Sequence, residues 1–280
     1  MRLHETIGRK LHRAIERPDR VRIAYLNRLV KLTGLPAETR IKLSSGRRMW
    51  VQLPDVVSVN LAYEGAYEPE VALMMEHVLH PGSVFFDVGA HYGLNTLHAY
   101  DLLQGDGKIV AFEPTPQTRR LLQKNCHELT DIVTIDDRVV SQYSGQELEL
   151  TVFDPRYSGC NTLENPRIPP EKLANLHKTT LPVTSVNLDD YCAGTGIYPD
   201  VIKLDIENHE MAALQGAIQL LKTHCPNIIM EIGDLGRGPR NSTESCLALL
   251  SSLGYRFWQV DNGILVPYTG DVEKANILAE

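Results

Sequence analysis

The stretch Val84–Glu113, VFFDVGAHYGLNTLHAYDLLQGDGKIVAFE, predicts a strand, a turn, a helix and a second strand. Val84–Val88 is a short apolar run of the kind that lies buried in parallel sheets. Leu94–Leu103 follows as the helix, and after a turn around Gly105 the run Lys108–Phe112 is the second strand. Because a helical crossover makes two such strands parallel neighbours, the stretch predicts an α/β fold.

Glycines and an acid at the ends of these strands predict a cofactor site. Gly89 and Gly93 bracket a turn in which the backbone can approach a ligand. Glu113 ends the second strand, at the edge where open α/β sheets bind ligands. Since a carboxylate there can accept hydrogen bonds from ribose hydroxyls, the site is expected to bind a nucleoside.

The spacing of the acid and the glycines in the turn indicates which nucleoside cofactor the site binds. A dinucleotide fingerprint reads G-x-G-x-x-G and holds a pyrophosphate, whereas this chain has Asp87-x-Gly89-x-x-x-Gly93. Asp87 would repel a pyrophosphate and attract the ammonium group of a methionine moiety. The pattern favours S-adenosylmethionine, and a structural glycine turn or a nucleotide-sugar site are the alternatives.

The composition is that of a globular protein. A chain of 280 residues, 43% of them hydrophobic, can form one α/β domain with an extension. The net charge of −7 argues against a nucleic-acid partner, because such partners need a basic footprint. No run approaches the ~18 apolar residues of a transmembrane segment. The five cysteines form no C-x-x-C pair, so reduced thiols and a cytoplasmic location are expected.

The first 33 residues combine apolar residues at helical spacing with many basic ones, interrupted near Pro18. One interpretation is contact with an acidic partner or an anionic membrane surface. The favoured one is packing of the apolar stripe on the domain or on a second subunit, which would give a homo-oligomer through this segment. The basic residues are Arg2, Arg9, Lys10, Arg13, Arg17, Arg20, Arg22, Arg28 and Lys31.

The remaining pattern alternates strands and helices around two special segments. Thr39–Leu53 alternates around a Ser-Ser-Gly turn and predicts a β-hairpin outside the main sheet. Asp154–Pro170 is a long loop, of the kind that is more often functional than idle. The other predicted elements are helices at 116–127, 211–222 and 242–253, strands at 132–136, 146–153, 201–204 and 227–230, and a hairpin at 255–267.

A second group of polar residues follows two later strands. Asp205 ends the run Val201–Leu204, and Glu231 ends Asn227–Met230, so both carboxylates are expected at the edge that holds the cofactor. Together with His209 they could bind a divalent cation, or act as general base on an acceptor hydroxyl.

Several residues nearby have structural interpretations. Glu207, His209 and Glu210 could cap and charge the start of the following helix. Lys203, inside an apolar strand, is expected to have a carboxylate partner. His91, in the glycine turn, is expected to pack over the cofactor rather than to catalyse.

Six motifs then occur in the order of a known family, between residues 60 and 235. They are YEPE (67–70), VFFDVGAHYG (84–93), VAFEPTP (110–116), VTSVNLDDY (183–191), VIKLDIENHE (201–210) and NIIMEIG (227–233). With them the chain resembles FkbM-type methyltransferases, which are class I S-adenosylmethionine-dependent enzymes. It departs from the family at His91, where Asn is usual, and at Asn208, where Gly is usual.

The resemblance implies a Rossmann-like class I methyltransferase fold. This is a seven-stranded, mostly parallel sheet with helices on both faces and a reversed last strand. We expect it over residues 63–280, after a helical and hairpin extension over residues 1–62. The implied function is O-methylation of a sugar, glycan or natural product. A nucleotide or nucleotide-sugar binding protein and an NAD-dependent oxidoreductase are the alternatives.

The resemblance also implies roles for single residues. Similar sugar O-methyltransferases use magnesium held by acids that correspond to Asp205 and Glu231. The resemblance implies no role for His209. Asp205 and His209 are expected to be the catalytic residues because of their position at this edge of the sheet. The YEPE segment and the residues after the third strand would close over the cofactor. The predicted cofactor-binding residues are Tyr67, Glu68, Asp87, Gly89, Ala90, His91, Gly93, Asn95, Glu113, Pro114, Asp137, Arg138 and Asp205.

Overall fold

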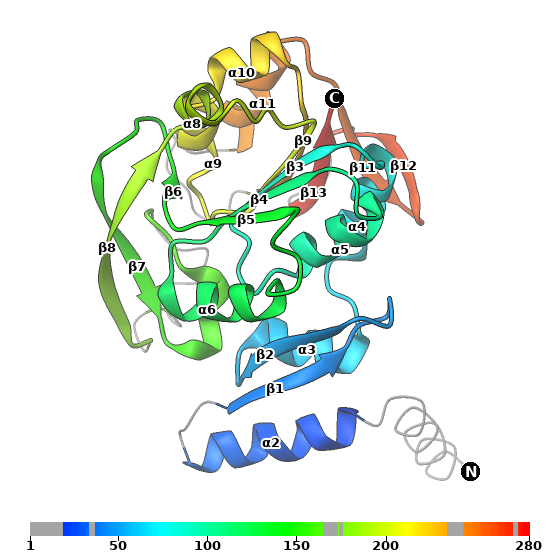
Figure 1. The fold of residues 1–280 in the computed structure, drawn as a ribbon, viewed down its shortest axis with the longest axis vertical. Coiled ribbons are helices and arrows are strands. Elements are labelled where there is room, and N and C mark those ends of the chain that lie inside the picture. The colour runs from blue at the N-terminus through cyan, green and yellow to red at the C-terminus, as the bar shows by residue number, and fades with distance from the viewer. Residues whose placement is uncertain (1–18, 34–36, 165–172, 174–175, 234–242, 271–273) are drawn as a thin grey trace. The chain divides into compact units, whose positions relative to one another are not determined.

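The computed structural model describes residues 19–33, 37–164, 173, 176–233, 243–270 and 274–280 (Figure 1). It divides into two compact units. The smaller contains the residues up to Tyr67 together with Pro155–Ser158, and the larger contains Glu68–Asp154 and Gly159–Glu280. The first half of the basic segment and residues 165–170 of the predicted long loop lie outside the described residues.

The smaller unit consists mainly of two helices and a hairpin. β1 and β2 pair antiparallel in a sheet of their own, which confirms the predicted hairpin. α2 contacts α3 and both strands and buries Ile23 and Val30, so the described half of the basic segment is a helix that packs within the smaller unit. The elements are α2 (Asp19–Thr33), β1 (Ala37–Lys42), β2 (Arg48–Leu53) and α3 (Val56–Glu64).

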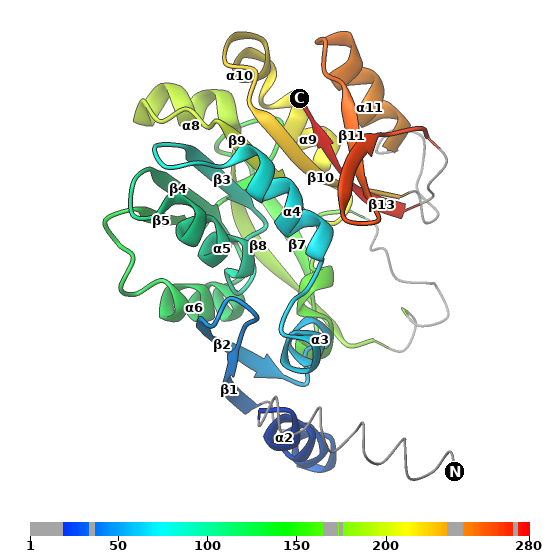
Figure 2. The same cartoon turned by 90° about the vertical axis from the view of Figure 1, so that its right-hand side faces the viewer.

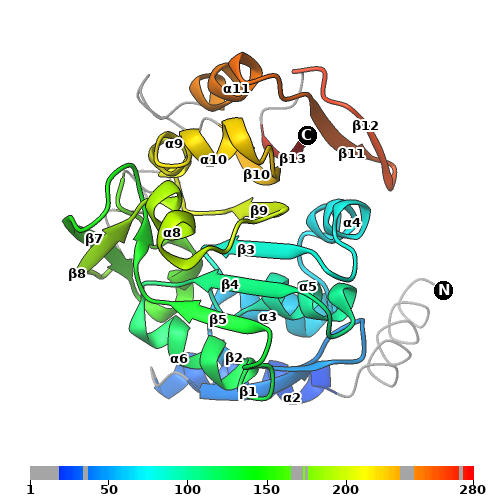
Figure 3. The ribbon, with the colours of Figure 1, turned by 45° about the horizontal axis from the view of Figure 1, so that its top comes forward.

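The larger unit is built on a sheet with the strand order β12-β11-β13-β10-β9-β3-β4-β5 (Figure 3). The neighbours from β10 to β5 are parallel, and β13 pairs antiparallel with β10, which confirms the mostly parallel α/β sheet and its reversed strand. The described residues give eight strands rather than seven, because β12 is added at the edge. The strands are β3 (Val84–Val88), β4 (Lys108–Phe112), β5 (Val133–Asp136), β9 (Val201–Leu204), β10 (Asn227–Gly233), β11 (Phe257–Asp261), β12 (Ile264–Pro267) and β13 (Lys274–Ala279).

Helices cover both faces of this sheet, and α4 and α5 lie together on one of them (Figure 2). On the other face, apolar residues of α8 to α11 form one core with the strands. Alternation along β3 divides its side chains, because Phe86 and Val88 belong to that core whereas Asp87 faces Thr96 of α5. The helices are α4 (Pro69–Val78), α5 (Leu94–Leu103), α6 (Pro116–Asn125), α8 (Leu188–Thr195), α9 (Glu210–Gln215), α10 (Ile218–Thr223) and α11 (Thr243–Ser252).

Two differences from the predicted elements bear on the candidate site. The helix predicted over 211–222 is two short helices, α9 and α10, separated at Gly216, where a Cβ atom would lie 2.2 Å from the main-chain oxygen of Ser141. β10 continues to Gly233, so Glu231 lies within this strand and not after it. The cause is β13, an element that was not predicted, which pairs with β10 as far as Gly233.

A smaller sheet with the order β6-β8-β7 completes the larger unit. After β7 the chain forms a short 3-10 helix, and Thr162 then returns to bridge with Thr151 of β7. None of the described helices is both long and apolar enough to cross a bilayer. The elements are β6 (Val139–Val140), β7 (Glu147–Phe153), η1 (Pro155–Cys160) and β8 (Lys178–Val186).

Candidate functional site

The C-terminal ends of three parallel strands join the predicted site loops. The main-chain N–H groups of Gly89 and Ala90 donate to the oxygen of Phe112 at 3.1 and 3.0 Å, which ties the loop after β3 to the end of β4. The N–H of Asp205 donates to Val88 at 3.1 Å, which ties the loop after β9 to β3. The predicted cofactor loop and the predicted acceptor loop therefore lie side by side.

The two turn glycines are required by packing within the protein. Both have left-handed backbones, with φ of +87° at Gly89 and +90° at Gly93. A Cβ atom on Gly89 would lie 2.0 Å from the main-chain oxygen of Asp205, and one on Gly93 would lie 2.6 Å from Leu122 Cδ1. The sequence explained these glycines by a ligand, but the structure shows that the loop after β9 already occupies the space beside Gly89.

Glu113 is a buried carboxylate directly after β4. Its Oε2 accepts a hydrogen bond from the N–H of His91 at 2.9 Å. Its Oε1 accepts from the N–H of Thr115 at 2.8 Å and from the hydroxyl of Thr118 at 2.7 Å. The carboxylate thus holds the glycine turn against the start of α6, and its position is fixed by both elements. The His91 ring packs against Tyr92, with centroids 3.8 Å apart.

Asp87 is a fully buried carboxyl group on β3. Its Oδ2 accepts the hydroxyl hydrogen of Thr96 at 2.6 Å. Its Oδ1 is buried and has no hydrogen-bond partner among the described residues. Burial raises the pKa of Asp87 above its ordinary value, although the charge of Lys203 and the bond from Thr96 act in the opposite direction. A buried acceptor without a donor is costly, so Oδ1 is suited to a donor from a ligand.

Two arginines hold the loops after β4 and β5. Arg138 makes a two-point contact with Asp136, at 2.9 Å from Nε and 2.6 Å from an Nη atom, and lies 5.7 Å from the ring centroid of Tyr191. Arg119 donates to the main-chain oxygen of Pro114 at 2.7 Å, and another of its Nη atoms lies 3.7 Å from Asp137. The predicted residues Pro114, Asp137 and Arg138 are thus brought to one rim. Arg119 was not predicted as a site residue, although its position in the first turn of the helix after β4 was a signal.

Lys203 is the one lysine or arginine among the buried residues that the structure describes. Its Nζ lies 2.8 Å from Asp205 Oδ2, which confirms the predicted carboxylate partner. In the sheet, Lys203 is the register partner of Asp87. Burial by itself lowers the pKa of Lys203, but the charges of the neighbouring acids outweigh burial and hold it above the ordinary value.

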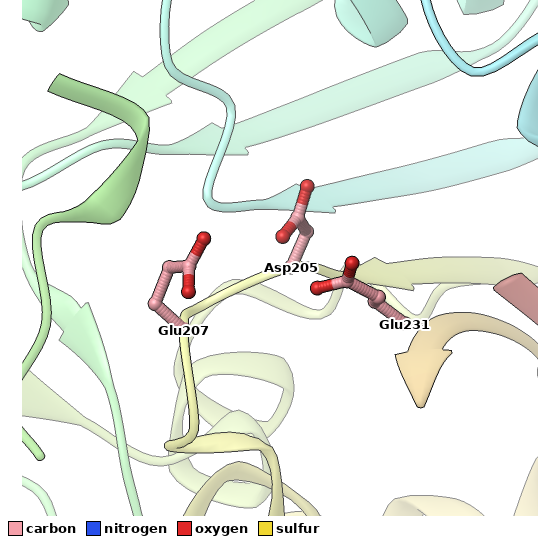
Figure 4. Close-up of side chains that lie close together, drawn as sticks. All are labelled: Asp205, Glu207 and Glu231. Carbon is pink, nitrogen blue, oxygen red and sulfur yellow. The ribbon is translucent and has the colours of Figure 1, made fainter. Parts of the chain in front are cut away.

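Three carboxylates form a close group beside this ion pair. Ligand oxygens of Asp205, Glu207 and Glu231 all lie within 4.8 Å of one another, and Figure 4 shows Asp205 between the other two. Helix capping was one of two interpretations of Glu207; in the structure it precedes α9 with a φ of +49° and belongs to this group. Asn208 also has a left-handed backbone, with φ of +78°, which explains why glycine is suited to that position. Carboxylate oxygens this close are a donor set of the kind that magnesium binds.

His209 does not belong to the carboxylate group. Its Nε2 lies 2.9 Å from the hydroxyl of Ser141, and its Nδ1 lies 3.3 Å from a carboxylate oxygen of Glu164. The hydroxyl of Thr162 donates to the main-chain oxygen of Glu207. The loop after β7 is thus held against the loop after β9, and both ring nitrogens of His209 contact protein groups.

For the other predicted cofactor-binding residues, the structure gives their positions in the fold. Glu68 is the N-cap residue of α4, with a φ of +49°. Ala90 is buried in the glycine turn, and Asn95 lies half-buried in the first turn of α5. Tyr67 ends the first of the two chain segments that make up the smaller unit.

The methyltransferase FkbM domain family matches residues 87–257, which is more than half of the chain. No curated protein matches this chain. Among solved structures, a methyltransferase FkbM from Methylobacillus flagellatus KT is similar, with 17% identity over 81% of this chain and a TM-score of 0.44. This chain spans only 55% of the length of that protein.

Two further structures show comparable similarity. An S-adenosylmethionine-dependent O-methyltransferase from Thermotoga maritima has 15% identity over 86% of this chain and 76% of its own, with a TM-score of 0.43. A fibrillarin from Aeropyrum pernix with natively bound S-adenosylmethionine has 12% identity over 86% of this chain and 93% of its own, with a TM-score of 0.44.

Proposed function

Because the chain belongs to the FkbM family of S-adenosylmethionine-dependent methyltransferases, we propose that it methylates a hydroxyl group on a sugar, glycan or other small-molecule acceptor. The observation that carries this proposal is the single edge formed by the loops after β3, β4 and β9. This edge carries the cofactor acids Asp87 and Glu113 next to Asp205, so that a methyl donor and an acceptor could meet there.

The cofactor roles follow the chemistry of each group. Glu113, which already accepts three hydrogen bonds, would accept further ones from the ribose hydroxyls. Asp87 would receive the ammonium of the methionine moiety at Oδ1. Asp137 and Arg138 would lie beside the adenine, with Ala90, His91, Gly93, Asn95 and Pro114 lining the turn and Tyr67 and Glu68 closing over it.

The sulfonium of S-adenosylmethionine supplies an activated methyl group. When bound, the cofactor would give that methyl group to the acceptor oxygen and leave as S-adenosylhomocysteine, and the hydroxyl proton would pass to a base of the protein. The chain's own task is to align the acceptor and take that proton. Asp205 is our proposed orienting residue and His209 the proposed base, which would have to exchange one of its contacts for the acceptor.

A metal ion is a further part of the proposal. Asp205 and Glu231 would hold magnesium, with Glu207 as a third carboxylate in reach. When bound, magnesium would lower the pKa of an acceptor hydroxyl. The competing arrangement has no metal, and Asp205 alone orients the acceptor.

We base the proposed acceptor class and cellular location on the composition of the chain. The net charge of −7 favours a small-molecule or glycan acceptor over nucleic acid. None of the five cysteines, all of which the structure describes, forms a disulfide, which suits a reducing cytoplasm. We place the methyltransferase domain at residues 63–280, and propose that the extension over residues 1–62 serves self-association.

Titration of the purified protein with S-adenosylhomocysteine and with NAD tests the cofactor. We expect binding of the first and none of the second. The opposite result would support an oxidoreductase, and binding of neither would contradict both. A methylated product, detected by mass spectrometry after incubation with metabolite extracts, would identify the acceptor.

A further inference from the structure

The buried ammonium of Lys203 lies between the two halves of the site. Its Nζ is hydrogen-bonded to Asp205 on the acceptor side, and its register partner is Asp87 on the cofactor side. Glu68, at the start of α4, also acts on its charge. A cation inside a central strand is expensive unless it is paired, so its position is specific.

Asp205 is not the only acid next to Lys203, because Asp87 lies beside it in the sheet. Residues paired across neighbouring parallel strands project from the same face of the sheet, so Lys203 and Asp87 lie on one face. Asp205 follows Lys203 by two residues and its carboxylate holds the ammonium at 2.8 Å. The positive charge is thereby anchored beside Asp87, whose Oδ1 has no hydrogen-bond donor among the described residues.

We propose that Lys203 is a positioning residue for the methionine end of the cofactor. Anchored by Asp205, its ammonium holds the buried carboxylate of its register partner Asp87 in place, so that Oδ1 can receive the cofactor's ammonium group. This inference rests on the proposed function. Lys203 touches neither the nucleoside nor the reacting atoms, and it acts through Asp87.

The test compares two ligands that share a nucleoside. S-adenosylhomocysteine carries the amino-acid group, whereas 5′-methylthioadenosine has the same adenosine and thioether without it. Calorimetry on Lys203→Met should show S-adenosylhomocysteine weakened about ten- to a hundred-fold, the range for a lost charged hydrogen bond, with 5′-methylthioadenosine changed about two-fold or less. A general structural defect would weaken both ligands alike.

Two controls frame this result. Glu113→Gln should weaken both ligands together, because both carry the ribose. Lys222→Met removes an exposed lysine in α10 and should change neither. Equal weakening of the two ligands by Lys203→Met, or no weakening, would overturn the inference.

A double substitution covers the case in which Lys203→Met does not fold. Asp87→Asn/Lys203→Met removes both charges, so that no buried Asp87 carboxylate is left without its cation, while Asp205 loses its ion pair as it does in Lys203→Met. Since Lys203 acts through Asp87, the double variant should bind S-adenosylhomocysteine as Asp87→Asn does. A further loss in the double variant, or an Asp87→Asn variant that binds normally, contradicts the mechanism. If the wild-type protein binds neither ligand, the proposed function and this inference are both overturned. If the wild-type protein binds both ligands and Lys203→Met weakens both equally, only the inference is overturned.

Discussion

The main-chain oxygen of Asp205 lies 2.0 Å from the position that a Cβ atom on Gly89 would occupy. The glycine turn after β3 and the loop after β9 are therefore in direct contact, and no side chain fits between them. Because one loop carries the proposed cofactor residues and the other the proposed acceptor residues, this contact fixes the spacing of the two halves of the site.

We predict that Gly89→Ala destabilises the fold. The left-handed backbone alone should cost about 1 kcal/mol, and the collision with Asp205 should raise the loss to about 2–4 kcal/mol. Urea denaturation measures the difference. Gly105→Ala is the matched control, because Gly105 has a φ of +85° and nothing within 4 Å of its Cβ position. Equal losses in the two variants would show that the Asp205 contact is unimportant.

We predict that Glu113→Gln weakens S-adenosylhomocysteine binding about ten- to a hundred-fold, which corresponds to about 1.5–3 kcal/mol. An amide has one acceptor oxygen, so it cannot accept from His91 and from the two threonines as the carboxylate does. Calorimetry gives the affinity and melting gives the stability. Glu128→Gln, at an exposed residue, is the control. A folded Glu113→Gln protein with wild-type affinity would rule out the ribose assignment.

Local signals explain which parts of the fold were predictable. β3, α5, β4 and β9 have the predicted limits, because apolar runs there are punctuated by glycines and acids. The predicted end of β10 was wrong because β13, more than forty residues later in the chain, pairs with β10 and extends it. A local sequence pattern does not indicate such long-range pairing. For the candidate site, the acids that follow β4 and β9 indicated that Glu113 and Asp205 would lie at one edge of the sheet. The Glu164–His209 contact could not be predicted, since it depends on how a long loop folds back.

We predict that the exposed face of α2 mediates self-association. Ile23 and Val30 are buried, but Tyr25, Leu29 and Leu32 are 68%, 44% and 77% exposed at helical spacing. Replacing these three by serine should lower the sedimentation coefficient if they form a subunit contact, and should leave melting unchanged. Deleting residues 1–33 should in addition lower stability. A monomeric wild-type protein that loses vesicle binding on the triple substitution would favour the membrane interpretation.

We predict that His209→Ala slows methyl transfer at neutral pH and reduces stability by about 1–3 kcal/mol, because Ser141 and Glu164 lose their contacts. His209→Gln, which retains hydrogen-bonding capacity but cannot act as a base near neutral pH, separates the two effects. A base role requires both variants to be slow. Recovery of the rate in His209→Gln would mean that the ring only holds the loop, and equal rates in His209→Ala and wild type would eliminate the histidine.

The last prediction concerns the carboxylates Asp205, Glu207 and Glu231. Three negative charges with ligand oxygens within 4.8 Å repel one another, and the ammonium of Lys203 compensates only part of that charge. A divalent cation would compensate the rest, so we expect methyl transfer to stop in EDTA and return with Mg²⁺. Mn²⁺ should bind the wild-type protein in a spin-resonance titration and bind Glu231→Gln about ten-fold or more weakly, because a neutral amide replaces a charged ligand. Asp101→Asn, at an exposed acid of α5, should leave Mn²⁺ binding unchanged. Full turnover in chelator together with absent Mn²⁺ binding would leave the metal-free arrangement, in which Asp205 alone orients the acceptor hydroxyl.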